Sequence, residues 1–385
     1  GISTETSANK FEKIPHELSI DKKFQIINNF ANKYKDNIRT QIEKLNILVN
    51  WEYDKYTFDI DHINLVQETF VNLYNQGYIY RGLGLVNYDT LLKTSISDLE
   101  VEYIEKNSYL YTIKYNIKDT NNYVEVCTTR PETIFGDVAL CVHPLDPRYI
   151  DLHNQKVLIP IINREIPIIC DEYVDINFGT GVLKITPAHD INDYKLSKKY
   201  NLEIINIIDK NNHMNIILPD NKYGNIEQKT PIEVRSILEE HFDIIIKKEP
   251  IKNKIPISSK SKAPVETIMM EQWFLKQDQV GKIIHDNNKL NIYPDTWKNL
   301  YLDWLNNLND WCISRNMVWG HKIPAWFNGS KYIVSIDKPG EQWIQTTEVL
   351  DTWFSSALWP ISYKESFNIF PTTMLVTGYD IIYFW

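Results

Sequence analysis

The sequence lacks the patterns that mark membrane-spanning, disulfide-linked or zinc-ribbon proteins. Its 385 residues include four cysteines, none of which forms a C-x-x-C pair. Neither a zinc ribbon nor a disulfide framework is therefore indicated, and a reducing compartment fits best. No run reaches the roughly 18 apolar residues of a membrane span, and the residues from Gly1 do not form a signal peptide. With no internal repeat either, we expect an ordinary globular enzyme in the cytoplasm, although an organelle stays open.

The chain also lacks the positive charge that would attract nucleic acid to its whole surface. Its 41 Lys and Arg residues oppose 50 Asp and Glu residues, and the formal charge is −9. Any nucleic acid must therefore be bound by a local basic patch. One candidate is the segment 247–262, where six lysines accompany a single acid and prolines keep the backbone extended. An RNA-contacting arm and a solvated linker are equally good interpretations of that segment.

What the chain has is a large apolar fraction. At 43% hydrophobic residues it can bury a large core, and its length favours two domains over one. Apolar residues at helical spacing predict helices at 21–51 and 61–77, and alternating ones predict β structure from residue 104. We further expect short strands at 156–162, 182–186 and 203–209, helices at 192–200, 231–241 and 297–308, and a strand at 374–380.

Two polar segments carry the residue types that a hydrolytic pocket needs. They read CTTRPETIFGD at 127–137 and GTGVLKITPAHDINDY at 179–194. Lys184 and Thr186 are two apart on a predicted strand, so their side chains lie on the same face. This spacing places a cation beside a hydroxyl.

Two carboxylates follow at the start of a predicted helix. Asp190 and Asp193 are one turn apart, so they share a face and favour the positive end of the helix. In isolation, an aspartate at this place is more often a simple helix cap. His189 together with the two aspartates is only a weak metal-binding pattern.

Together the two segments resemble the editing insertion of class I aminoacyl-tRNA synthetases, in the version found in valyl-tRNA synthetases. Further runs extend the resemblance over nearly the whole chain, namely GISTET, LVNYDTLLKTSISDLEVEY, MEQWFLK, NDWCISRNMVWGHKIPAW, VLDTWFSSALWP and LVTGYDIIYFW. The resemblance implies an α/β fold in which a Rossmann-like nucleotide-binding catalytic domain is interrupted by a β-rich editing domain. We expect catalytic parts at 1–103 and 257–385 and the editing domain at 104–256. Since neither the His-Ile-Gly-His nor the Lys-Met-Ser-Lys-Ser signature of the family is present, we expect an internal fragment with an incomplete synthetic site.

The resemblance implies a set of residues for the editing pocket, which are Arg130, Thr133, Lys184, Thr186, Asp190 and Asp193. We expect Asp190 to hold the aminoacyl α-ammonium group as a buried carboxylate, because such a pair forms a short charge-assisted bond. Asp193 and Thr186 are expected to accept the hydroxyl of threonine, which valine lacks. The expected reaction is hydrolysis of threonyl-tRNA that was charged by mistake.

The resemblance also implies a valine pocket walled by Trp353, Ile381 and Trp385, with Asp380 near the amino group. Gly378 would let a nucleotide approach the backbone closely. The implied parent activity is ATP-dependent attachment of valine to its tRNA, with ATP and Mg²⁺ as substrate, and we expect this fragment to be synthetically inactive by itself. The expected partners are valine, threonine as the edited amino acid and the tRNA for valine, and the expected state is a monomer. No bound metal is expected, since the places where relatives carry metal-binding cysteines hold none here.

Two other classes of function stay open. One is a stand-alone hydrolase that acts on threonyl-tRNA made elsewhere. The other is a non-catalytic tRNA-binding or assembly remnant, which would bind RNA through the lysine-rich segment without hydrolysing an ester.

Overall fold

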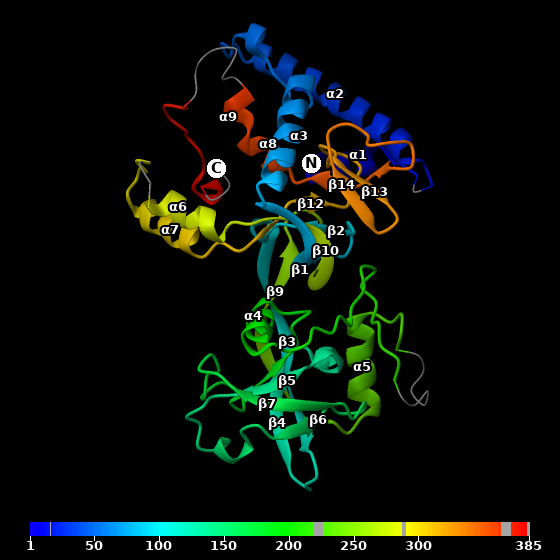
Figure 1. Ribbon diagram of the computed structural model, residues 1–385, viewed down its shortest axis with the longest axis vertical. Coiled ribbons are helices and arrows are strands. Elements are labelled where there is room, and N and C mark those ends of the chain that lie inside the picture. Colours follow the sequence, from blue (N-terminus) through cyan, green and yellow to red (C-terminus); the bar gives the residue numbers. More distant parts are fainter. Residues whose placement is uncertain (16, 219–225, 287–289, 363–370, 383–385) are drawn as a thin grey trace. The chain divides into compact units, whose positions relative to one another are not determined.

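The computed structural model describes residues 1–15, 17–218, 226–286, 290–362 and 371–382 (Figure 1). The chain forms two compact units. The first unit combines 1–82 with 271–385, and the second unit is 83–270.

The chain enters the second unit within strand β1 (Ile79–Asp89) and leaves it within β10 (Val265–Leu275). The limits expected for the editing domain, 104 and 256, fall inside β3 (Val101–Ile117) and β9 (Ile245–Ser258). Because β3 and β9 pair with each other over their length, the second unit keeps both strands whole. It also includes the antiparallel pair of β1 with β2 (Thr94–Ile96).

The first unit begins with three helices, α1 (Ile2–Glu12), α2 (Ile20–Lys44) and α3 (Ile60–Asn75), with a short 3-10 turn at Trp51–Tyr53. The second and third confirm the helices predicted at 21–51 and 61–77. α2 ends earlier than predicted because Asn46 adopts a left-handed φ of 52°. The N–H of Ile47 then donates back to the carbonyl of Ile42 at 3.3 Å, which closes the helix end.

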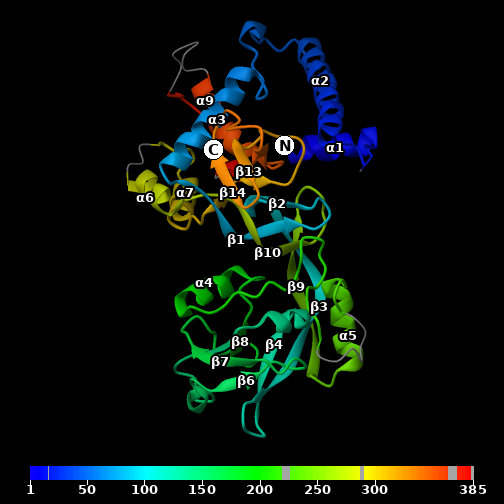
Figure 2. The same ribbon diagram turned by 45° about the vertical axis from the view of Figure 1, so that its right-hand side comes forward.

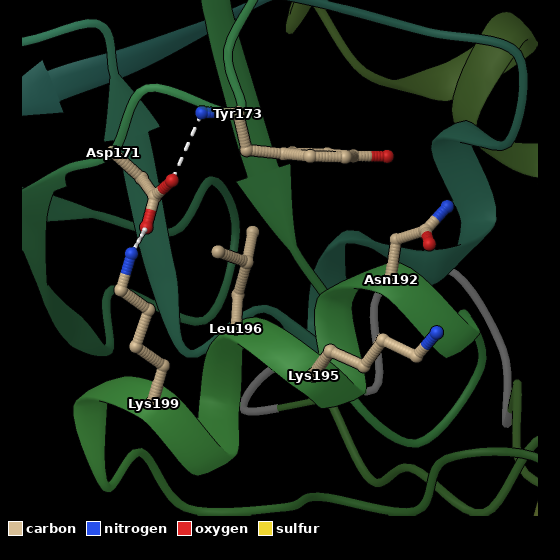
Figure 3. Close-up of a pocket in the computed structure, with 6 residues that line it drawn as sticks. All are labelled: Asp171, Tyr173, Asn192, Lys195, Leu196 and Lys199. Carbon is tan, nitrogen blue, oxygen red and sulfur yellow. Dashed lines mark hydrogen bonds and ion pairs between the residues drawn. The ribbon is translucent and has the colours of Figure 1, made fainter. Parts of the chain in front are cut away.

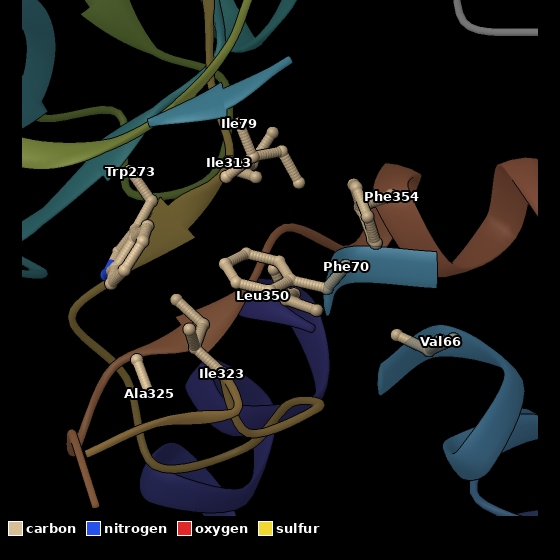
Figure 4. Close-up of a cluster of buried hydrophobic side chains, with 9 residues drawn as sticks. All are labelled: Val66, Phe70, Ile79, Trp273, Ile313, Ile323, Ala325, Leu350 and Phe354. Carbon is tan, nitrogen blue, oxygen red and sulfur yellow. The ribbon is translucent and has the colours of Figure 1, made fainter. Parts of the chain in front are cut away.

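The core of the first unit is a cluster of buried side chains around α3 (Figure 4). Val66 and Phe70 are four residues apart, so they share one face of the helix, and both are fully buried. The ring of Phe70 meets the rings of Trp273 and Phe354 edge-on, with centroids 5.4 and 6.2 Å apart, an arrangement that aromatic rings favour. The cluster is completed by Ile79, Ile313, Ile323, Ala325 and Leu350.

Short helices and antiparallel strand pairs form the C-terminal part of the first unit. The helices are α6 (Asp278–Asp286), α7 (Thr296–Asn306), α8 (Thr352–Ala357) and α9 (Trp359–Ser362). The pairs join β10 to β11 (Trp311–Cys312), β12 (Ser314–Arg315) to β16 (Val349–Leu350), and β13 (Ala325–Asn328) to β14 (Lys331–Val334) and β15 (Ile344–Gln345). α7 confirms the helix predicted at 297–308. All of these strand pairs are antiparallel, so they do not supply the parallel nucleotide-binding sheet, which stays a prediction.

The strand predicted at 374–380 is wrong. No strand forms there, and the segment leads into a 3-10 turn at Tyr379–Ile381. Met374 and Val376 are 76% and 86% exposed. Among the described residues no neighbouring strand pairs with this segment, so its backbone groups form no ladder.

A mixed sheet organises the second unit. Among the described residues its strand order is β4-β3-β6-β7-β5-β8, with β9 also paired to β3. The strands besides β3 and β9 are β4 (Tyr123–Thr128), β5 (Ala139–Val142), β6 (Lys156–Leu158), β7 (Glu165–Cys170) and β8 (Val182–Ile185). In β3 the alternating residues Tyr111, Ile113, Tyr115 and Ile117 are buried, which confirms the period of two that the sequence predicted.

Two helices pack against this sheet, α4 (Ile191–Tyr200) and α5 (Pro231–His241), and Figure 2 shows them against different parts of it. Both confirm the sequence prediction. α5 begins with Pro231 in its first turn, behind a capping box formed by Thr230 and Glu233. The strand predicted at 203–209 is wrong, and only Ile208 makes an isolated bridge there. Its apolar residues come in adjacent pairs, so they do not alternate between two faces.

The lysine-rich segment 247–262 is mostly strand β9, which pairs with β3 from Ser258 to Ile245. The solvated-linker interpretation is therefore wrong. Some of its lysines form ion pairs: Lys248 Nζ lies 2.6 Å from Glu239, and Lys262 Nζ lies 2.6 Å from Glu102. These acids offset part of the positive charge, and an RNA-contacting role for the segment stays a prediction.

Replacing Phe70 by Ala removes the ring that joins α3 to Trp273 and Phe354. We expect the free energy of unfolding to fall by about 3–5 kcal/mol, because the buried volume cannot be refilled. Urea denaturation measures this loss. The matched control is Leu48→Ala, since Leu48 is 99% exposed and its truncation should change stability by no more than about 0.5 kcal/mol. Equal effects of the two substitutions would contradict the assigned core.

Candidate active site

The two polar sequence segments meet at the end of β8 in the second unit. Lys184 lies on β8, and Thr186 directly follows the strand. Lys184 Nζ and Thr186 Oγ1 are 2.5 Å apart, so the cation and the hydroxyl are side by side, as their spacing predicted. The two residues are only 9% and 2% exposed.

Asp137 joins this pair from the first segment. It follows a 3-10 turn, Pro131–Gly136, and is fully buried. Its Oδ1 accepts from Thr186 Oγ1 at 2.6 Å and from Lys184 Nζ at 3.1 Å, while its Oδ2 accepts from the Tyr115 hydroxyl at 2.5 Å. Burial raises the pKa of Asp137, although these donors and the charge of Lys184 oppose the shift. The site thus contains a buried ion pair.

Sequence reasoning missed Asp137. The residue lies within the motif CTTRPETIFGD, but nothing in its spacing to other polar residues distinguishes it. The available signal was its apolar surroundings, since Phe135 and Val138 flank it in the sequence and both are buried. A charged residue in an apolar run needs a partner, and that partner is distant in the sequence.

Asp193 approaches the same site from α4. Its Oδ2 accepts the backbone N–H of Thr186 at 2.8 Å, and the residue is 7% exposed. Burial, together with the charge of Asp190, raises the pKa of Asp193 to about 7. Asp193 therefore changes its charge near neutral pH.

Asp190 is an exposed helix cap, so the expectation of a buried carboxylate is wrong. Its Oδ1 accepts the N–H groups of Asn192 at 2.8 Å and Asp193 at 3.1 Å, the usual partners of a cap. Asp190 precedes the first residue of α4, and the next two residues, Ile191 and Asn192, are also exposed. Its carboxylate still lies close enough to raise the pKa of Asp193.

Arg130 and Thr133 hold the 3-10 turn in the first segment. Arg130 pairs with Glu132 at 3.2 Å and with Glu266 at 2.7 Å. The hydroxyl of Thr133 donates to the carbonyl of Arg130 at 2.9 Å. Glu132 is fully buried and also pairs with Arg235 at 2.8 Å. A direct role of Arg130 and Thr133 on a substrate stays a prediction.

His189 is a neutral imidazole that links the site to two other segments of the same chain. Its Nε2 accepts the N–H of Ile207 at 3.1 Å, and its Nδ1 therefore carries the proton that it donates to the carbonyl of Thr267 at 3.0 Å. Burial lowers the pKa of His189 to about 3. Within the described ranges no three His, Cys, Asp or Glu side chains are grouped as around a metal ion, and no helix is long and apolar enough to cross a membrane.

A pocket of about 220 Å³ lies beside the first turns of α4 (Figure 3). Its lining residues are Asp171, Tyr173, Asn192, Lys195, Leu196 and Lys199. Asp171 accepts the backbone N–H of Tyr173 at 2.9 Å and pairs with Lys199 at 2.7 Å, which fixes this wall. Burial and the charges of Asp190 and Asp193 raise the pKa of Tyr173.

The residues expected to form a valine pocket lie in the first unit. Trp353 is in α8, and Ile381 is half-buried in the 3-10 turn at Tyr379–Ile381. Gly378 precedes that turn with a φ of −64°, a conformation open to any residue. Trp385 and the side chain of Asp380 lie outside the described residues. The valine pocket stays a prediction.

Comparison with known proteins gives a consistent result. The model of the family "tRNA synthetases class I (I, L, M and V)" matches residues 1–338 and 329–385. The valine-tRNA ligase of Mycoplasmoides gallisepticum is 39% identical over 406 residues, covering 100% of this chain and 47% of that relative. The valine-tRNA ligase of Pseudothermotoga lettingae is 40% identical over 410 residues, with coverages of 100% and 47%. A crystal structure of Agrobacterium radiobacter K84 agnB2 LeuRS with tRNA and LeuAMS covers 95% of this chain and 50% of that one, with 13% identity and a TM-score of 0.38, too low to support an argument.

The chain therefore belongs to the class I tRNA synthetases, which confirms the resemblance. Within that family it is similar to the valine-tRNA ligases, and it spans about half the length of the curated relatives that it matches.

Replacing Asp193 by Asn should stabilise the protein, and more so at high pH. The folded-state pKa of Asp193 is about 7 and its ordinary value is 3.8, so the native state binds a proton that the unfolded state has lost. The free energy of unfolding then falls as the pH rises from 3.8 to about 7. Asn does not titrate, so the variant does not lose this stability. At about 1.4 kcal/mol per pKa unit, the window of about two units between pH 5 and the folded-state pKa makes the expected gain from Asp193→Asn about 2.6 kcal/mol larger at pH 8 than at pH 5. Urea unfolding of both proteins at both pH values tests this, and a gain independent of pH would contradict it.

Proposed function

We propose that this chain carries the editing site of a valine-tRNA ligase and hydrolyses threonyl-tRNA. The observation that carries the proposal is the buried cluster of Lys184, Thr186 and Asp193, in which a cation, a hydroxyl and a carboxylate of raised pKa meet. Polar groups with perturbed pKa values converging at one place are typical of reactive sites. The similarity to valine-tRNA ligases supports threonyl-tRNA as the proposed substrate.

In the proposed reaction, water adds to the ester carbonyl and the bond to the terminal ribose oxygen breaks. That oxygen takes up the proton that the water loses, and free threonine leaves. Negative charge develops on the carbonyl oxygen, and a fixed cation such as Lys184 stabilises it. At neutral pH the ionised form of Asp193 can take up a proton, or it can accept a hydrogen bond from a hydroxyl group. Asp190, at the rim of the site, attracts the ammonium group of the amino acid.

The chemistry of the two amino acids explains why such a site is useful. Valine and threonine have nearly the same shape, and valine sites of this enzyme class are the standard case of weak discrimination, about 10² against threonine. At about 1.4 kcal/mol per tenfold, this is about 2.8 kcal/mol, short of the 10⁴ to 10⁵ that translation needs. A polar hydrolytic site that binds the threonine hydroxyl supplies the remaining discrimination.

For the longer protein we propose ATP-dependent attachment of valine to its tRNA, with ATP and Mg²⁺, valine and the tRNA as substrates and partners. The support is the identity of the relatives and the family to which the chain belongs. Trp353, Ile381 and Gly378 are the proposed contributions of this chain to that reaction, together with Asp380 and Trp385.

The chain should hydrolyse threonyl-tRNA for valine faster than valyl-tRNA, and Asp190→Asn should slow this hydrolysis by about 10- to 100-fold. Asn keeps an oxygen that can cap α4 but removes the charge that holds the substrate ammonium, and a hydrogen bond to a charged group is worth about 1.5–3 kcal/mol. Release of labelled amino acid measures both rates. Asp190→Ala, which also removes the cap, is the control for stability. Equal rates on the two substrates would reject selective editing, and hydrolysis of neither would favour the non-catalytic alternative.

A further inference from the structure

The buried carboxylate of Asp137 has no role in the reaction proposed above, yet it contacts both Lys184 and Thr186. The donor inventory of these groups fixes the direction of each hydrogen bond. A lysine ammonium has three donors and no acceptor. Thr186 Oγ1, 2.5 Å from Lys184 Nζ, must therefore accept from it.

The single hydroxyl hydrogen of Thr186 is then directed to Oδ1 of Asp137, 2.6 Å away. Oδ1 also accepts from Lys184 Nζ at 3.1 Å. The three groups form a closed triangle in which Lys184 uses two of its three donors. No further acceptor for the third is found among the described residues, so one N–H remains for a ligand.

The main chain around Asp137 is held as firmly as its side chain. Arg164 donates to the carbonyls of Phe135 at 3.0 Å and Asp137 at 2.6 Å. Gly136 packs directly on Thr186, where a Cβ would come within 3.0 Å of the threonine methyl group. The carboxylate therefore has little freedom to move away from Lys184 and Thr186.

We infer that Asp137 is a positioning residue for the editing reaction. It holds the ammonium group of Lys184, with Thr186, so that one N–H faces the ester carbonyl. The chemical role inferred for Asp137 rests on the proposed function, whereas the contacts of Asp137 do not. Asp137 itself does not touch the substrate.

Tyr115 provides a matched control for a purely structural role. Its hydroxyl contacts the same carboxylate, but through Oδ2 at 2.5 Å, and it touches neither Lys184 nor Thr186 in the contacts described. Tyr115→Phe and Asp137→Asn each disturb the buried network, and we expect both to lower the melting temperature. Only Asp137→Asn removes the charge that faces Lys184.

The kinetic test compares hydrolysis of threonyl-tRNA by the two variants. Asp137→Asn should lower kcat by about 10- to 100-fold with little change in KM. This is less than the roughly 10²- to 10³-fold loss from removing an oxyanion donor outright, because Lys184 is still present in the variant. Tyr115→Phe should keep kcat within about threefold of the unmodified chain. Similar losses of kcat in both variants would mean that Asp137 only supports the fold.

A double-mutant comparison tests whether Asp137 acts through Lys184. In a Lys184→Met background, where the ammonium group is gone, Asp137→Asn should lower kcat by less than about twofold. A full further loss in that background would overturn the inference, because the two residues would then act independently.

The position of the ammonium group can also be observed without any reaction. In a chain labelled with ¹⁵N-lysine, the Nζ signal of Lys184 should be protected from exchange, and its absence in Lys184→Met assigns it. It should persist in Tyr115→Phe and disappear in Asp137→Asn. Persistence in Asp137→Asn would refute the positioning role. If the unmodified chain hydrolyses nothing, the proposed function fails, and this spectrum still decides the role of Asp137.

Discussion

A carboxylate buried away from water is stable only if hydrogen-bond donors reach both of its oxygens. In the second unit, Asp137 has such donors on both oxygens. Its donors come from distant elements: Tyr115 from β3, Lys184 from β8 and Thr186 from the turn after β8. The ion pair thus constrains the same strands that carry the candidate site. Removing one partner of such a pair costs more than the pair contributes, so fold and chemistry depend on the same contacts.

The site contains two buried carboxylates whose surroundings differ. Burial raises the pKa of both. Asp137 also faces a cation and two hydroxyl groups, which oppose its shift, whereas the largest charge effect on the pKa of Asp193 is that of another carboxylate, Asp190. The raised pKa of Asp193 is a cost to stability, as is common where a residue is retained for reactivity.

The sequence predicted the local features of the second unit but not the features that depend on contacts between distant segments. The alternation in β3 and the Pro231 start of α5 are local signals, and both held. The side-by-side arrangement of Lys184 and Thr186 follows from strand geometry alone. Asp137 was missed because its partners are distant in the sequence, and the strand at 374–380 was wrong because extended residues need a neighbour that no local pattern reports. The prediction of a buried Asp190 was wrong because its carboxylate caps α4, a role that its place before the helix already indicates.

Under the proposed function, the acceptor for the threonine hydroxyl can be assigned by elimination. Thr186 directs its only hydrogen to Asp137 and accepts from Lys184, and at 2% exposure it offers little surface to a ligand. Asp193 uses Oδ2 for the backbone N–H of Thr186, while Oδ1 has no hydrogen bond among the described residues. An ionised carboxylate can only accept, so Oδ1 distinguishes a hydroxyl from the methyl group of valine without any change in shape. Thr186 then contributes to selectivity indirectly, because its main chain fixes Oδ2 and its side chain fixes Lys184.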